Sequence, residues 1–436
     1  MESDHNEPEF NLRKWISNSM SFKVLLIVAL IIVMLVPEEM VSNLVNERMQ
    51  RSNKTISEIS SKWGGIQVLD GPLLSIPIKS STENRRFLHL YSEVLKVSAE
   101  IKPEIRNRGI FEAVLYSTTV QMKGEFKFPD KNELNIASEV LDFENAFLSF
   151  GVSDTSGITE SVVIEVNGEK FTAKPGVSVL TGLENGFHIP TNINFPGQTL
   201  AFSTTLSLNG NGSFQVVPTG KNTDVTIEST WKDPSFTGSF LPVSRKVDDS
   251  GFKAVWKVHD LQRNMRNFWF DKESVKEKPE FGAKLIQVND VYQRVQRVVK
   301  YAILFISFTF ATVFISERLT GISIHPLQYL LTGLASVFFY VLLLSTSEHL
   351  SFNTAYLVTS TLITLIIAGY AKGIFKSVKM ACTIGAVSSF LYMFLFSTLQ
   401  LEDYALLMGS CGLLFILVVV MYLTKGINSE EQLLQI

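Results

Sequence analysis

The sequence predicts an integral membrane protein in two parts, an α-helical transmembrane bundle and a large all-β, sandwich-like domain that begins with an α helix. The first observation is a set of six apolar segments, one near the N-terminus and five close together near the C-terminus. The second is the long stretch between them, where short runs of β-branched and aromatic residues are separated by turn residues. The third is composition: 46% of the residues are hydrophobic and 19% are charged, whereas soluble domains carry about 25% charged residues.

The apolar segments come first, because they divide the chain. A helix needs roughly 20 apolar residues to cross a bilayer. The first segment, residues 22–36, is short and contains Lys23, whose long stem can carry its ammonium to the interface. We expect an uncleaved anchor rather than a cleaved signal peptide, since no small-residue cleavage pattern follows Val36. Five further spans are predicted within residues 300–424, at about 301–316, 327–347, 352–371, 380–400 and 404–424.

Basic residues in short loops predict the orientation, because such residues stay on the cytoplasmic side. The short outer loops carry Glu348, His349, Glu402 and Asp403, and they contain no Lys or Arg. If the N-terminus is cytoplasmic, the following basic residues all lie on the cytoplasmic side: Arg13, Lys14, Arg318, Lys372, Lys376, Lys379 and Lys425. We therefore expect a multi-pass protein of a bacterial inner membrane. Residues 1–21 and 425–436 would be cytoplasmic tails, and residues 37–299 a periplasmic domain.

The predicted periplasmic domain begins with a helical pattern and continues with strands. Apolar residues recur at helical spacing over residues 38–63, which predicts an amphipathic helix. Beyond Gly64–Gly65, strict alternation predicts strands with one buried face around residues 200–208, 225–231 and 252–258. Asn167–Gly168 has the composition of a two-residue hairpin turn, because both turn positions need positive φ. The glycine cluster at residues 209–212 is interpreted as another hairpin loop. Many strands with regular turns indicate a sandwich or a barrel.

Several classes of function find no support in the sequence. A net charge of −3 argues against nucleic acid as a partner. The six histidines are scattered, and no motif for phosphate binding, zinc binding or a nucleophilic serine is present. We therefore expect no catalytic residues, no metal and no cofactor. Both cysteines, Cys382 and Cys411, lie in predicted spans, where we expect them to pack as small apolar residues.

The predicted spans carry no charge in their interiors, which argues for close helix packing rather than a transport pathway. Small residues such as Gly333, Gly385 and Gly409, together with many Ser and Thr residues, are typical of helix packing in membranes. A neutral solute is still compatible with such a bundle. The lipid bilayer is the partner that the sequence indicates directly.

Polar residues at the ends of the spans are the candidate functional residues. Glu317 and Arg318 follow one span, and His325–Pro326 opens the next, so a short loop brings them to one membrane face, where they could form a contact site. The simpler alternative is that Pro326 occupies the first helical position while Arg318 fixes the topology. Glu348 and His349 precede another span, where a carboxylate near a helix N-terminus is favoured by the helix dipole.

Residues 300–357, KYAILFISFTFATVFISERLTGISIHPLQYLLTGLASVFFYVLLLSTSEHLSFNTAYL, resemble the CreD family of inner-membrane proteins, which are often labelled cell envelope integrity proteins. The resemblance extends to LDGPLLSIPI at 69–78, GFHIP at 186–190 and DPSFTGSFLPVSRKVDDSGFKAVW at 233–256, and so covers nearly the whole chain after the first span. It implies an N-terminal anchor, a large periplasmic region and a C-terminal cluster of spans. It implies no reaction and no ligand.

The resemblance associates the chain with envelope integrity and, in some bacteria, with a two-component system that responds to envelope or metabolic stress. Its matches at Glu317, His325, Pro326, Glu348 and His349 make these residues candidates for sensitivity to mutation, without a defined role. Our hypothesis is a non-enzymatic membrane protein whose periplasmic β domain binds or senses an envelope component or envelope protein. The alternatives are a transporter or lipid-handling protein, which needs a cavity between the late spans, and a periplasmic hydrolase, which needs converging polar residues in one cleft.

Overall fold

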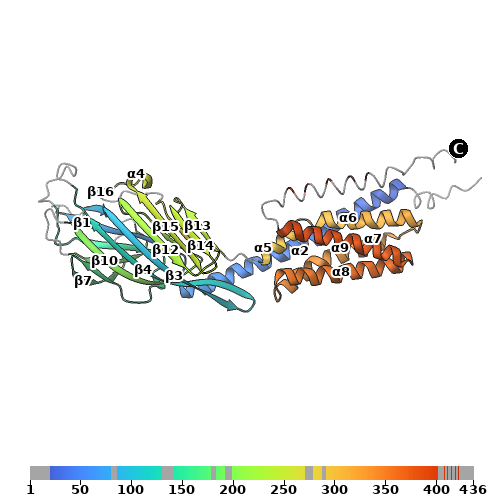
Figure 1. Cartoon of the computed structure of the whole chain (residues 1–436), viewed down its shortest axis with the longest axis horizontal. Coiled ribbons are helices and arrows are strands. Elements are labelled where there is room, and N and C mark those ends of the chain that lie inside the picture. Colours follow the sequence, from blue (N-terminus) through green and yellow to red (C-terminus); the bar gives the residue numbers. More distant parts are fainter. Residues whose placement is uncertain are drawn as a thin grey trace, which may run out of the picture. The chain divides into compact units, whose positions relative to one another are not determined.

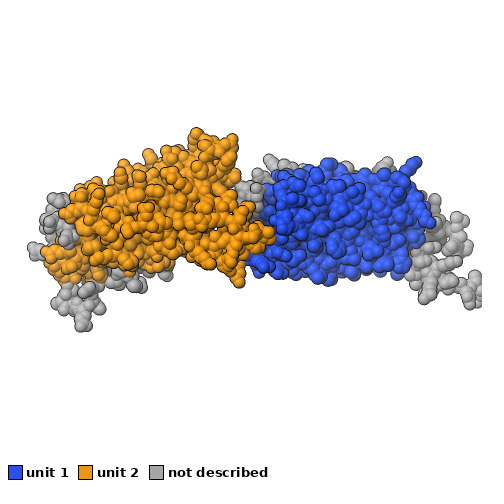
Figure 2. Space-filling model, turned by 90° about the horizontal axis from the view of Figure 1, so that it is seen from below, with its two compact units in different colours: residues 1–51, 290–436 blue, residues 52–289 orange. Residues whose placement is uncertain are grey.

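A computed structural model describes residues 20–79, 86–129, 141–177, 183–191, 199–270, 278–286 and 291–400, together with five residues between 407 and 421. The chain divides into two compact units (Figure 2). We call residues 1–51 and 290–436 the helical unit, and residues 52–289 the β unit. The combination of apolar helices and a large β domain confirms the predicted fold class.

Helix α2 runs without a break from Met20 to Trp63, with Pro37 inside it (Figure 1). The sequence predicted two helices here, a span at 22–36 and an amphipathic helix at 38–63. A proline removes one intrahelical hydrogen bond and disturbs one turn, at a cost of about 3 kcal/mol. The helix-forming segments on both sides of Pro37 are long enough to compensate for this local loss. The two predicted helices therefore form one continuous helix.

In the described residues, the helical unit contains four further long helices and the short α5. Five described helices, α2 included, are long and apolar enough to cross a membrane. Four of them lie within a few residues of predicted spans: α6 Ala302–Thr320, α7 Pro326–Ser347, α8 Phe352–Phe375 and α9 Val378–Gln400. The short α5, Val291–Val299, was not predicted as a span. The predicted span at 404–424, with Cys411 and Gly409, lies outside the residues described in full. Cys382 is a free, exposed thiol.

Small residues and rings pack the helical unit. A Cβ on Gly333 of α7 would lie 2.7 Å from the ring of Phe310 and 2.9 Å from the sulfur of Met34, so this glycine admits both side chains. A Cβ on Gly385 of α9 would approach Ala368 of α8 to 3.2 Å. The ring of Phe339 lies 4.5 Å, between centroids, from that of Tyr392. These glycines serve close packing, as expected from the sequence.

The β unit is a sandwich of two mixed sheets (Figure 1). In the described residues the first sheet has nine strands; its path is β13 (Pro234–Gly238), β17 (Phe281–Leu285), β11 (Ser213–Val216), β1 (Gln67–Ile78), β5 (Phe147–Val152), β9 (Gly186–Pro190) and β8 (Lys174–Pro175), with β2 (Arg86–Tyr91) on β1 and β16 (Phe268–Phe270) on β2. The second sheet has eight described strands, in the order β14 (Ser244–Asp248), β15 (Gly251–His259), β12 (Asn222–Ser229), β3 (Val94–Arg108), β4 (Phe111–Phe126), β10 (Leu200–Asn211), β6 (Val163–Val166) and β7 (Glu169–Thr172). Helix α4 (Asp260–Arg263) follows β15 directly.

The inward faces of both sheets form one hydrophobic core. The alternation predicted from the sequence is confirmed on β10, β12 and β15, where every second side chain is buried. Trp256 of β15 is fully buried and packs on Phe281 of the facing sheet, with ring centroids 5.6 Å apart. Burying a large apolar side chain contributes about 1.5–3 kcal/mol, so these faces hold the two sheets together.

One of the two predicted turns is confirmed and the other is wrong. Asn167 and Gly168 both have positive φ and join β6 to β7 in a hairpin. The glycine cluster at 209–212 does not form a hairpin. Asn209 and Asn211 still pair with β4, and Gly212, with a φ of 60°, turns the chain into β11, which belongs to the other sheet. This turn is therefore a corner between the two sheets of the sandwich.

Candidate functional site

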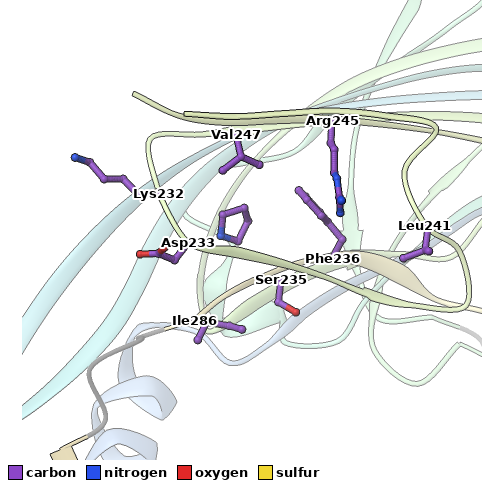
Figure 3. A pocket seen from close by; sticks show the side chains of 9 residues that line it. Lys232, Asp233, Ser235, Phe236, Leu241, Arg245, Val247 and Ile286 are labelled. Atoms are coloured by element: carbon purple, nitrogen blue, oxygen red, sulfur yellow. The ribbon is translucent and has the colours of Figure 1, made fainter. Parts of the chain in front are cut away.

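The open edge of the sandwich carries a groove where the terminal strands of the two sheets face each other (Figure 3). β13 ends the path of one sheet and β14 ends the other, and the residues that connect them cross from sheet to sheet. The groove has a volume of about 530 Å³. Its lining combines apolar and charged side chains: Lys232, Asp233, Pro234, Ser235, Phe236, Leu241, Arg245, Val247 and Ile286.

The core of the β unit fixes the floor of this groove. Phe236 of β13 packs edge-on against Trp256, with ring centroids 5.8 Å apart. The Trp256 Nε1–H donates to the carbonyl of Phe240 at 3.1 Å and so fastens the connection between β13 and β14. Gly238 ends β13 with a φ of 100°, and a Cβ there would lie 2.1 Å from the carbonyl oxygen of Glu280. Only glycine fits at that position, and this explains why segment 233–256 has a glycine at residue 238.

The wall of the groove is unusually open. All five residues of β14 are exposed, and Leu241 is 75% exposed. Figure 3 shows Phe236 and Arg245 pointing toward each other from facing strands, and the Arg245 guanidinium lies 6.0 Å from the centroid of the Phe236 ring. Among the described residues, neither Arg245 nor Lys232 has a carboxylate oxygen within 4.0 Å. An apolar floor with unneutralised cations suits a ligand that has an apolar body and an anionic end.

Neighbouring charges beside the groove cancel each other. The Nζ of Lys246 lies 2.9 Å from a carboxylate oxygen of Asp248. Hydrogen bonds from the Ser250 hydroxyl and from Lys246 lower the pKa of Asp248, and the same contact raises the pKa of Lys246. Because this pair is neutral in sum, Lys232, Arg245 and Asp233 set the local charge of the groove, which is +1 by counting two cations and one carboxylate.

The predicted site residues Glu317, His325 and Pro326 come together in the helical unit. Helix α6 continues through Glu317, whose side chain is only 3% exposed. The Tyr329 hydroxyl donates to Glu317 Oε2 at 2.8 Å, and Lys23 of α2 donates to Oε1. This corrects the expectation that the spans hold no buried charge. The helix ends at Gly321, in the left-handed region, rather than where the apolar run stops.

His325 and Pro326 begin α7, as the simpler alternative proposed. Pro326 occupies the first helical turn. The Leu327 N–H donates to His325 Nδ1 at 3.2 Å, and the His325 N–H donates to the Gln328 side chain at 3.0 Å. These reciprocal bonds cap the helix. Glu317 and His325 nevertheless line the same cavity. His325 therefore both caps α7 and belongs to a candidate site.

Glu348 and His349 lie at the other end of α7. Glu348 follows the last residue of α7 and does not cap α8, whose cap is the Ser351 hydroxyl. Instead, the Tyr292 hydroxyl donates to Glu348 Oε1 at 3.2 Å, and Arg48 of α2 lies 3.8 Å from the same oxygen. The side chain of His349 is exposed. The structure therefore separates Glu348 and His349 from the other three candidates.

Sequence reasoning missed the partners of these residues. Lys23 was interpreted as a residue that extends to the interface, yet its ammonium pairs with Glu317. Tyr329 lies one turn after His325 on α7, and that helical spacing was the available signal. For Arg245 and Phe236 no local signal existed, because they meet only through the order of strands in two sheets. Among the described residues, no group of three or more His, Cys, Asp or Glu side chains could hold a metal ion.

Comparison with known proteins places this chain in a family. The family model described as "Inner membrane protein CreD" matches residues 19–430. The curated inner membrane protein CreD of Escherichia coli (strain K12) is 32% identical over 415 residues, which cover 91% of this chain and 91% of that protein. The resemblance noted in the sequence is confirmed by both findings. This chain belongs to the CreD family of inner membrane proteins.

Proposed function

We propose that this protein is a non-enzymatic inner-membrane protein that supports envelope integrity by binding an envelope component in the edge groove of its β unit. The observation that carries the proposal is the groove itself, which joins an apolar floor around Phe236 to the cation of Arg245. The groove leaves both Leu241 and Val247 exposed, and an apolar part of a ligand would cover them together. An amphiphile with an acyl chain and an anionic head matches both features.

The proposed location of the β unit is the periplasm. Arg318 lies near the end of α6, and Lys372, Lys376 and Lys379 surround the connection from α8 to α9. These two connections lie on the same side if α6 to α9 cross the membrane in alternation. Basic residues in short loops favour the cytoplasmic side. With the start of α2 on that side as well, the β unit follows on the periplasmic side.

The binding proposal is tested with a fluorescent C16 fatty acid and the purified full-length protein in detergent-free nanodiscs. We expect Arg245→Gln to weaken binding about fivefold, which corresponds to about 1 kcal/mol for one exposed charge contact. Lys257→Gln is the matched control, because it removes one cation from β15 outside the groove. Leu241→Asp should weaken binding further, and because Leu241 is 75% exposed, we expect this variant to keep its fold. Equal binding by all variants would refute the groove as the site.

The cellular proposal has its own experiment. Cells that lack this protein are restored with the intact chain, Leu241→Asp or Lys257→Gln, and are scored for permeability to a large dye and for survival in detergent. We expect the intact chain and Lys257→Gln to rescue and Leu241→Asp to fail at equal expression. Full rescue by Leu241→Asp would separate envelope integrity from the groove. A labelled-solute flux assay in vesicles addresses the rival reading, a transporter.

A further inference from the structure

The helical unit contains a cavity of about 290 Å³ at the end where α6 stops and α7 starts. Its walls come from α2, the last turn of α6, the connection and the first turn of α7. Half of the ten residues that line it are apolar, namely Phe22, Leu26, Ile27, Ile324 and Pro326, and the others are Lys23, Glu317, Ser323, His325 and Tyr329. The volume is close to the lower end of common ligand sites, about 300 Å³. All of these residues belong to the helical unit.

An ion pair forms the polar side of this cavity. Lys23 pairs with Glu317, and their side chains are 20% and 3% exposed. Taking both charges out of water costs several kcal/mol per ion before their attraction is counted, and apolar residues often serve stability equally well. Ionisable residues buried among membrane helices therefore point to a function that uses the charges.

The cavity offers hydrogen-bond donors for an anionic group. Lys23 has three N–H donors, and two of them go to Glu317 and to Ser323 Oγ, the latter at 3.2 Å. The Ser323 hydroxyl accepts that bond and keeps its own proton to donate. His325 Nδ1 accepts from the Leu327 N–H, so the ring proton is assigned to Nε2. One ammonium, one hydroxyl and one imidazole N–H are the donor set that a phosphate oxygen accepts from.

The same cavity offers an acceptor for a cationic group. Glu317 Oε1 accepts a hydrogen bond from Lys23 and Oε2 accepts one from Tyr329, and a carboxylate has about four acceptor positions. The charges of Lys23 and Glu317 sum to zero. A ligand with a net negative charge would therefore meet Glu317 unfavourably, whereas a zwitterion places one charge against each member of the pair.

We propose that this cavity binds the phosphoethanolamine headgroup of a membrane phospholipid. The phosphate lies against Lys23, Ser323 and His325, and the primary ammonium lies against Glu317. A primary ammonium can donate N–H groups to the free acceptor positions of this carboxylate, whereas a quaternary choline has no N–H to donate. The acyl chains then extend over the apolar surface beside the cavity, where Phe22 and Leu327 are exposed. This site is independent of the groove in the β unit.

The test uses the wild-type full-length protein and counts retained lipid by native mass spectrometry. Nanodiscs of equal parts phosphatidylethanolamine, its mono-, di- and trimethylated forms, and phosphatidylglycerol are the source of lipid. We expect about tenfold higher retention of phosphatidylethanolamine than of the trimethylated lipid or phosphatidylglycerol, with the partly methylated lipids between. Equal retention along the methylation series would overturn the ammonium–carboxylate contact, and preference for phosphatidylglycerol would make this an anion site instead.

A pair of variants assigns the preference to this cavity. Glu317→Gln keeps the shape and removes the charge, and we expect it to lose the preference for the unmethylated headgroup. Glu348→Gln removes a carboxylate at the other end of α7 and should keep that preference. If Glu317→Gln reduces folded protein, Ser323→Ala on the exposed connection tests the phosphate contact with retention of all phospholipids at the site as the readout. A headgroup preference that survives in Glu317→Gln, or undiminished phospholipid retention in Ser323→Ala, would contradict the proposal.

Discussion

Two ion pairs, one in each unit, differ in their burial. In the β unit, Lys253 and Glu228 pair across neighbouring strands at 2.6 Å, but both side chains are about half exposed. In the helical unit, Glu317 pairs with Lys23 while it is almost fully buried. Water screens the first pair, which is worth about 0–1 kcal/mol, and cannot screen the second. Burial therefore decides how much an ion pair matters in either unit, and the Lys278–Asp70 pair of the β unit, with side chains 18% and 17% exposed, resembles the second kind.

Apolar residues, by contrast, differ between the units in their exposure. In the β unit an apolar side chain is buried when it faces the other sheet, as with the fully buried Trp256. In α8 of the helical unit, Leu365 is 65% exposed. A membrane supplies the apolar surroundings that the β unit must make for itself. Burial thus indicates how much an apolar residue contributes to stability in the β unit, but it does not do so on the outer surface of the helices.

The largest expected effect tests this difference directly. Trp256→Ala should lower the free energy of unfolding of the β unit by about 3–5 kcal/mol, because it leaves a large cavity in the core. Leu365→Ala, the matched control, should change stability by less than about 0.5 kcal/mol, since it removes surface contacts only. Thermal unfolding of the full chain in detergent, with protease cleavage as the readout, measures both. Comparable losses in the two variants would contradict the distinction.

The buried pair gives the next effect. Glu317→Ala leaves the Lys23 ammonium without its carboxylate in a largely buried position, and we expect a loss of about 3 kcal/mol. Glu348→Ala breaks a longer contact of 3.8 Å with Arg48, whose side chain is 38% exposed, and should cost about 0.5 kcal/mol. The temperature at which the detergent-solubilised chain aggregates orders the two variants. The double variant Lys23→Met with Glu317→Ala should recover part of the loss.

Much of the fold could be predicted from the sequence, because periodicity reports burial directly. The alternation around Phe202, Ile227 and Trp256 placed three strands of one sheet correctly. The end of α6 was misplaced because the prediction followed apolarity, which stops at Ser316, while hydrogen bonding continues to Gly321. A glycine just after a polar turn is a C-terminal signal that was present in the sequence.

The candidate sites were predictable only where they are local. Glu317 and His325 were recognised because a short connection joins their helices. Lys23 lies 294 residues away from Glu317 in the chain, so no spacing rule relates them. The groove around Phe236 and Arg245 depends on which strands end each sheet, and strand order is set by pairing across the whole β unit. Turn chemistry alone misled at Gly212, because positive φ serves a corner between sheets as well as a hairpin.

Helix packing gives a third, smaller effect. Gly333→Ala would place a Cβ 2.7 Å from the Phe310 ring and 2.9 Å from the Met34 sulfur, so these two buried side chains must shift. We expect a loss of about 1–3 kcal/mol from this overpacking. Gly369→Ala on α8 meets nothing within 4 Å and should be neutral or slightly stabilising. Thermal stability in detergent compares the two, and the addition of Met34→Ala should relieve the Gly333→Ala loss.

The smallest effect concerns a carboxylate at the surface of the β unit. Asp154 accepts hydrogen bonds from the Ser156 hydroxyl at 2.6 Å and from the Gly65 N–H at 2.7 Å. The hydrogen bond from the Ser156 hydroxyl lowers the pKa of Asp154 most, and the backbone N–H groups of Gly65 and Ser156 lower it further. Partial burial raises this pKa, but by less than these hydrogen bonds lower it. Asp154→Ala removes an N-terminal cap and should cost about 1 kcal/mol at neutral pH.

The pH dependence of that loss separates the charge from the cap. Because the folded pKa of Asp154 lies below its unfolded value, the charged form stabilises the fold above the unfolded pKa of about 3.9. This contribution disappears as the pH falls through the lower, folded pKa. The stability difference between the wild type and Asp154→Ala, measured by urea unfolding of the β unit in the full chain, should therefore be constant from pH 7 to 5 and shrink below pH 4. A difference that stays constant into strong acid would mean that side-chain shape, and not its charge, holds Gly65 and Ser156 in place.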